Sequence, residues 1–180
     1  MDYRVIENHY GPLIHFNDWE IVDGDGSLHA PGGTVQMLSG STANLMRNDY
    51  PLPGGGDVEI TLTFNFERVE SGSSAEFYFH RNRDTTGFRV RVEPDGVNVF
   101  HKDDTICSIE PVSLDQEAVH EIKMVTLGES YSVHFNDNVV AEGHLDPPYT
   151  ENEGRLGVVV DDADLRIITC QENFIAHEVD

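Results

Sequence analysis

Basic side chains are scarce in this sequence. Lys and Arg total 11 against 33 Asp and Glu, which gives a formal net charge of −22, and the only lysines are Lys102 and Lys123. A surface of this charge repels the phosphates of nucleic acids and of anionic lipids. We therefore expect no nucleic acid and no membrane among the partners. The acidity itself is typical of a highly soluble protein or of adaptation to a saline environment.

Long apolar runs and cysteines are also few. No stretch approaches the roughly 18 apolar residues of a membrane-spanning helix, and the first residues lack the apolar core of a secretory signal. We expect a cytoplasmic protein if Met1 is the native start, and a secreted one otherwise. Cys107 and Cys170 have no zinc or redox spacing. They are predicted to be buried thiols, or to form a disulfide in an oxidising compartment.

Helical periodicity is weak, and alternation of period two takes its place. Residues 58–67 alternate between apolar and polar without a break, which predicts a β-strand with one buried face. The residues on that face are Val58, Ile60, Leu62, Phe64 and Phe66. Residues 88–93 alternate in the same way, and Pro94, Asp95 and Gly96 then supply a tight turn.

Similar segments recur along the rest of the chain. Further strands are predicted at 19–23, 43–48, 75–81, 97–102, 120–127, 130–135, 139–145, 154–160 and 165–170. The only helix candidates are 113–118 and the C-terminal tail. A chain of 180 residues with 16 Gly suits one domain rich in turns. We predict an all-β fold, a two-sheet antiparallel β-sandwich in a single domain, 1–180, with its core at about 19–170.

Several short motifs mark the ends and turns of these strands. In chain order they are WEIVDG (19–24), GDVEI (56–60), AEFYFHR (75–81), GFRV (87–90), HEIK (120–123), SYSVHFN (130–136) and GRLGV (154–158). Their order resembles the concanavalin A-like lectin/glucanase superfamily, above all laminin G-like and 3-keto-disaccharide hydrolase-type domains. The resemblance covers about 19–170 and implies a concanavalin A-like jelly roll that binds a carbohydrate or glycoside. The closely spaced acids of the family's glucanases (E-x-D-x-E) are absent, so no catalytic residue is carried over.

The strand 75–81 and its neighbour 88–93 predict a polar surface. If Phe77 and Phe79 face the core, the alternate side chains of both strands face outwards. We predict a register with His80 opposite Arg89 and Tyr78 opposite Arg91.

The turn after 93 then brings Asn98 and Phe100 alongside. The predicted ligand-binding residues are Glu76, Tyr78, His80, Arg89, Arg91, Asn98 and Phe100, and Glu93 lies on the same surface. Planar donors, carboxylates and aromatic rings are the groups that hold sugars. An ordinary solvated sheet face with cross-strand ion pairs has the same composition.

Asp23 and Asp25 flank Gly24 in an alternation of oxygen donors that also occurs in calcium loops. The downstream Glu of an EF-hand is missing, and an Asp-Gly hairpin turn explains the residues equally well. We expect no cofactor, and Ca²⁺ at Asp23 and Asp25 is the one metal that the sequence suggests. The nine histidines show no metal-pair spacing. His80 with Glu76 or Glu93 could act as a general acid/base pair.

Two classes of function remain from the sequence. The first is a carbohydrate- or glycoside-binding module, which the missing acid cluster favours. The alternative is a small-molecule enzyme that uses the sandwich cleft, either a glycoside-cleaving enzyme or a cyclase or isomerase. The missing signal peptide favours this alternative. Both imply a small-molecule or glycan ligand, and the sequence does not set the oligomeric state.

Overall fold

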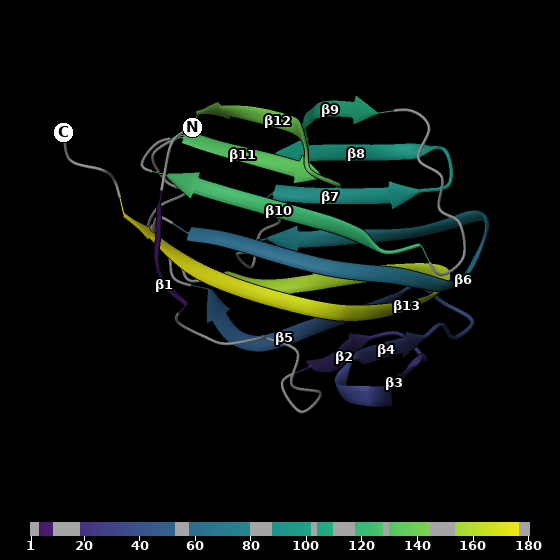
Figure 1. Cartoon of the computed structure of the whole chain (residues 1–180). Helices are drawn as coiled ribbons and strands as arrows, with labels where there is room; N and C mark the ends of the chain where they lie inside the picture. Colours follow the sequence, from purple (N-terminus) through teal and green to yellow (C-terminus); the bar gives the residue numbers. More distant parts are fainter. Residues whose placement is uncertain are drawn as a thin grey trace.

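In its described residues, the computed structural model of the chain consists of β-strands, turns and the short 3₁₀ segment η2 (Pro31–Gly33) (Figure 1). It describes residues 4–8, 19–52, 58–79, 88–101, 104–109, 118–127, 130–144 and 154–176. The strands are β1 (Arg4–Asn8), β2 (Trp19–Asp23), β3 (Ser27–His29), β4 (Val35–Leu38), β5 (Asn44–Leu52), β6 (Val58–Phe79), β7 (Phe88–Glu93), β8 (Gly96–His101), β9 (Asp104–Ile109), β10 (His120–Leu127), β11 (Ser130–Phe135), β12 (Asn138–His144) and β13 (Gly154–Ala176). None of the described residues belongs to a helix of the length and apolarity needed to cross a membrane.

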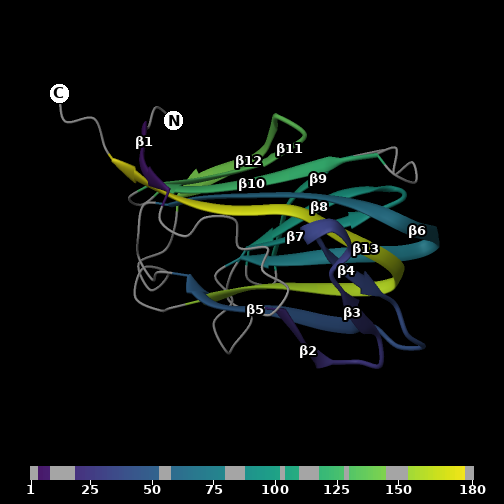
Figure 2. The same ribbon diagram turned by 60° about the horizontal axis from the view of Figure 1, so that its bottom comes forward.

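The strands form two layers that pack face to face (Figures 1 and 2). One layer, the β10 sheet, has the order β12-β11-β10-β6-β13-β4-β3, and β1 pairs with the end of β13. The other, the β7 sheet, has the order β9-β8-β7-β6-β13-β5-β2. Every strand pair is antiparallel. The predicted two-sheet antiparallel sandwich is confirmed.

Strands β6 and β13 belong to both layers. The first part of β6 pairs with β10 and its last part pairs with β7, while β13 stays beside β6 throughout. The prediction of two separate strands in each of these regions is therefore wrong. Asp161, Asp162 and Ala163 lie between the two predicted strands, but the strand continues through them with a register shift, and Asp162 has φ 49°. A bulge of this kind bends a strand without ending it.

The C-terminal tail is a strand as far as residue 176, so the helix predicted there is wrong. The tail residues pair with β6 on one side and with β1 on the other. These ladder hydrogen bonds satisfy the backbone of the tail, which removes the advantage of a helix. The other helix candidate, 113–118, lies almost wholly outside the described residues.

The core lies between the two sheets and follows the predicted alternation. Ile60, Leu62, Phe64 and Phe66 are all buried, and so is Trp19. The rings of Phe64 and Phe77 lie 4.6 Å apart between centroids. Because both belong to β6, the passage of this strand from one sheet to the other brings its own side chains into contact across the core.

Candidate functional site

The predicted ligand-binding residues lie on the outer face of the β7 sheet. Phe77, Phe79, Val90 and Val92 are buried, so the side chains between them point away from the core. This is the face inferred from the alternation. The residues of the arginine patch, as we call this surface, are Glu76, Tyr78, Arg89, Arg91, Glu93, Asn98 and Phe100. His80 lies outside the described residues.

The register of the patch differs from the predicted one by two residues. Tyr78 lies opposite Arg89 and Glu76 opposite Arg91, whereas we predicted Tyr78 opposite Arg91. A shift of two leaves every side chain on the same face, so the alternation alone could not distinguish the two pairings. Two rows result across β6, β7 and β8. One is Tyr78–Arg89–Phe100 and the other is Glu76–Arg91–Asn98.

Arg89 is held from two sides. Its Nη1 lies 3.4 Å from Oε1 of Glu76, and its Cζ lies 4.9 Å from the centroid of the Phe100 ring. A guanidinium at that distance from an aromatic ring is attracted by the ring quadrupole. The Arg89 side chain is only 20% exposed. It therefore acts as a fixed part of the surface, and one face of Phe100 carries a cation.

Arg91 is the accessible arginine of the patch. Its side chain is 42% exposed, and its Nε lies 3.1 Å from Oε1 of Glu93. Asn98 lies directly opposite on β8. A planar cation thus stands beside an amide that can both donate and accept hydrogen bonds.

The patch ends towards β5. Gly157 on β13 lies opposite Tyr78, and Arg47 on β5 lies opposite Gly157. Because Gly157 has no side chain, the row is interrupted there. Arg47 forms its own ion pair with Glu20, with Nη2 and Oε1 2.9 Å apart.

Comparison with known proteins concerns the fold. No family model and no curated protein matches this sequence. Among solved structures, a galectin-like protein of unknown function from Bacillus subtilis has a TM-score of 0.76 at 11% identity, over 98% of this chain and 100% of that one. The carbohydrate-binding module CBM66 from Bacillus subtilis has a TM-score of 0.65 at 18% identity, over 87% and 95%. The exoplasmic/lumenal domain of VIP36, in its Ca²⁺/Man3GlcNAc-bound form, has a TM-score of 0.69 at 11% identity, over 99% of this chain and 93% of that one.

The chain has the concanavalin A-like lectin fold. These likenesses, together with the two antiparallel layers, confirm the fold that the sequence motifs implied. At such identities they concern the arrangement of the strands and not the ligand.

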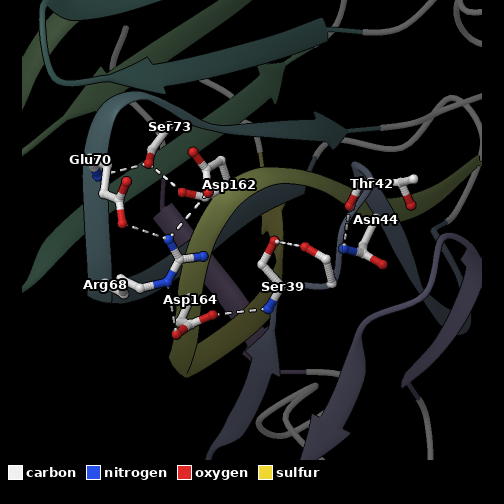
Figure 3. A network of polar contacts seen from close by, with 9 residues as sticks. Ser39, Thr42, Asn44, Arg68, Glu70, Ser73, Asp162 and Asp164 are labelled. Atoms are coloured by element: carbon white, nitrogen blue, oxygen red, sulfur yellow. Dashed lines mark hydrogen bonds and ion pairs between the residues drawn. The ribbon is translucent and has the colours of Figure 1, made fainter.

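At the rim of this lectin-type sandwich, where β6 and β13 pass between the layers, one arginine binds three carboxylates (Figure 3). Nη1 of Arg68 lies 3.2 Å from both Glu70 and Asp162, and its Nε lies 3.3 Å from Asp164. Asp162 is the main cause of a raised pKa of the Arg68 guanidinium. Asp164 also accepts a hydrogen bond from the Ser39 backbone N–H at 2.9 Å. The cluster ties the bend of both long strands to the end of β4.

Asp25, a predicted calcium ligand, has its carboxylate occupied by the protein. Its Oδ2 accepts hydrogen bonds from Ser41 N at 3.1 Å and Ser41 Oγ at 2.5 Å. Its Oδ1 accepts from Thr42 N at 3.2 Å and Thr42 Oγ1 at 3.0 Å. These bonds, the Ser41 hydroxyl above all, hold the pKa of Asp25 well below its usual range. No group of three or more His, Cys, Asp or Glu that could hold a metal occurs in the described parts of the chain. Calcium at Asp23 and Asp25 stays a prediction.

A second polar cluster lies on the opposite side of the sandwich, on the outer face of the β10 sheet. It surrounds a hollow of about 450 Å³, which we call the β10-face hollow. The described residues that line it are Thr34, Asn65, Glu67, Val119, Arg166 and Ile168. This cluster is not evident from the sequence, because its members come from strands far apart in the chain. The available signal was Asn65, since asparagine is disfavoured in strands and sits here in a long alternating one.

Asn65 is the unusual member of this cluster. The residue is only 8% exposed, and neither its Oδ1 nor the Nε of Arg166 has a hydrogen-bond partner among the described residues. Glu67, in contrast, pairs with Arg166 and accepts a hydrogen bond from Gln36. A buried polar atom without a partner costs about 1–3 kcal/mol of stability.

Proposed function

We propose that this protein binds carbohydrate through the arginine patch on the outer face of the β7 sheet. The observation that carries the proposal is the exposed guanidinium of Arg91 beside Asn98 and Glu76, one row from the ring of Tyr78. Within a row, neighbouring strands lie about 4.8 Å apart, which suits the spacing of groups on one or two sugar rings. The names of two proteins of the same fold, a carbohydrate-binding module and a domain bound to Man3GlcNAc, support this class of ligand.

The proposal gives each side chain a role. Arg91 offers paired donors to two neighbouring hydroxyls, and the Asn98 amide donates and accepts beside it. Tyr78 stacks on the apolar face of the sugar, because the Phe100 ring already carries the Arg89 guanidinium on one side. The two arginines of the patch balance Glu76 and Glu93, and the net charge of −22 repels anions. The expected ligand is therefore a neutral glycan.

Replacing Arg91 by lysine tests the proposal. We expect glycan binding to weaken at least tenfold, about 1.4 kcal/mol, because a lysine ammonium cannot hold two hydroxyls in one plane. The melting temperature should stay nearly constant, since exposed ion pairs contribute about 0–1 kcal/mol. A neutral-glycan array identifies the ligand, and isothermal titration calorimetry then compares the variants.

Arg47→Lys is the matched control. The Arg47 side chain is 40% exposed, forms one ion pair on the same face and lies beyond the gap at Gly157. Its substitution should leave glycan binding unchanged. A large fall in stability of Arg91→Lys with unchanged binding would mark the patch as structural. Cleavage of the bound glycan would establish the enzymatic alternative.

We also propose that sugar binding at the patch requires no metal, since its donors are amide, guanidinium and carboxylate groups. Glycan affinity should be the same in EDTA and in about 1 mM CaCl₂, a concentration that fills extracellular calcium modules. The melting temperature should not change between the two buffers. A rise with calcium that Asp25→Asn abolishes would instead establish the predicted site at Asp23 and Asp25.

A further inference from the structure

We propose that the β10-face hollow is a second binding site, which takes one neutral sugar or polyol unit. It lies on the outer face of the β10 sheet, so it is independent of the arginine patch on the β7 sheet. The two sites would let one domain hold two glycan chains, or two segments of one chain, on opposite sides.

The pairing register of β4, β13 and β6 brings the lining residues of the hollow together. Arg166 on β13 lies opposite Gln36 on β4 and opposite Asn65 on β6. Val119 immediately precedes β10, whose first residue pairs with the neighbour of Asn65. These residues therefore form one row across the sheet, with Glu67 beside it on β6.

The buried polar atoms indicate the chemistry of the ligand. Asn65 is more than nine-tenths buried, with an acceptor, Oδ1, that has no partner among the described residues. The Nε of Arg166 is a buried donor that also has no hydrogen-bond partner among the described residues. Buried polar groups are almost always satisfied, so an orphaned acceptor beside an orphaned donor points to a missing group that does both. A hydroxyl donates one hydrogen bond and accepts others, and neighbouring hydroxyls are the defining feature of sugars and polyols.

Charge and shape narrow the class further. The ion pair between Arg166 and Glu67 leaves the hollow without net charge, and the chain as a whole carries −22. An anionic ligand is therefore disfavoured. Val119 is exposed, and Ile168 is the extra residue of a bulge in β13, so two apolar side chains are among those that line the hollow. They suit the C–H face of a sugar ring. The volume of about 450 Å³ lies within the usual size of small-molecule sites.

The first test follows the side-chain amide of Asn65 by NMR. D-mannose, D-fructose and sorbitol serve as neutral probes, and gluconate serves as an anionic probe of similar size. We expect saturable shifts of the Asn65 amide and of Val119 with at least one neutral probe at millimolar concentration, and none with gluconate. The same shifts should persist in Arg91→Lys, which separates this site from the arginine patch. Absence of shifts with all neutral probes, or a stronger response to gluconate, overturns the proposal.

The second test compares two buried asparagines. Asn65→Leu removes the orphaned acceptor, so it should abolish the shifts of Val119 while the melting temperature stays constant or rises. Asn44 is completely buried, and its side-chain amide accepts a hydrogen bond from Gly26 N at 2.6 Å and donates one to Thr42 O at 2.8 Å. Asn44→Leu should therefore lower the melting temperature by several degrees.

If Asn65→Leu loses as much stability as Asn44→Leu, Asn65 is structural and the proposal is wrong. Val119→Asp provides a variant that does not disturb the core, because Val119 is exposed. It should weaken binding of the neutral probe at least tenfold with an unchanged melting temperature. Unchanged binding in Val119→Asp would also overturn the site.

Discussion

Replacing Phe64 by alanine should lower the free energy of unfolding by about 4 kcal/mol, the usual cost of deleting a buried aromatic ring. Phe64 is completely buried, and its ring lies 4.6 Å from Phe77, 5.9 Å from Phe66 and 5.7 Å from His120 between centroids. These neighbours come from β6 and β10, so no single loop can collapse into the space. Urea denaturation followed by tryptophan fluorescence measures the loss, because Trp19 is buried in the same core.

Phe100→Ala is the matched control, because it deletes the same phenyl ring from a position outside the core. Phe100 is half-buried on the outer face of the β7 sheet, where its ring lies against Arg89. Its removal should cost about 1 kcal/mol, the sum of a partly exposed surface and one cation–π contact. If Phe64→Ala cost no more than Phe100→Ala, the two sheets would not share the core described above. Phe64→Leu fills more of the buried volume than alanine and should cost less, so it keeps the measurement feasible if the alanine variant does not fold.

Gly24→Ala should be the most damaging change at the surface, with a loss of about 3 kcal/mol or more. Gly24 has φ +108°, a conformation that residues with a β-carbon rarely adopt. An added β-carbon would lie 2.8 Å from both the Ala43 carbonyl oxygen and Asn44 Cα, and closer still to Asn44 Oδ1. That oxygen accepts the hydrogen bond from Gly26 N, so the buried amide of Asn44 would lose its place. Chemical denaturation measures the loss.

Gly72→Ala isolates the effect of geometry. An added β-carbon at Gly72 would have no atom within 4 Å, and its φ is ordinary. We expect its stability to change by no more than about 0.5 kcal/mol, or to rise slightly because alanine restricts the unfolded chain. Equal losses at the two glycines would show that the turn at Gly24 does not depend on its left-handed backbone.

The alternation of residues 58–67 predicted the buried side of the sheet but not how far the strand extends. Phe64 and Phe66 are buried as expected, whereas the polar stretch after 67 predicts an end to the strand that the structure does not have. The strand continues because the long-range ladder with β13 satisfies its backbone there. Pairing partners distant in the chain leave no periodic signal in a single segment.

The sequence predicts which residues form the arginine patch, but it does not predict their pairing across the strands. Burial of Phe77 and Val90 determines which face Arg89 and Arg91 occupy, and burial follows from the apolar pattern. The partner across the ladder depends on the length and shape of the connection between β6 and β7, which the pattern does not contain. The predicted pairing was consequently two residues off, and Tyr78 lies opposite Arg89.

The sequence does not locate the β10-face hollow, although Asn65 is an unusual residue in a long alternating strand. Arg166 meets Asn65 and Gln36 only because β13 lies between β6 and β4, an order decided by the topology of the whole sheet. The individual residues look like ordinary polar positions on the outside of strands. Only the spatial arrangement shows that Asn65 is buried with an unsatisfied oxygen.

The position of β13 in both sheets also sets the order in which the protein can fold during synthesis. β13 is made after the other described strands, yet it lies at the centre of each layer beside β6. At about 5–20 residues per second, the ribosome releases β6 several seconds before β13 can pair with it. During that interval β6 exposes an unpaired, apolar edge of a kind that invites pairing with other chains. The net charge of −22 gives mutual repulsion between nascent copies during this interval, before the fold is complete.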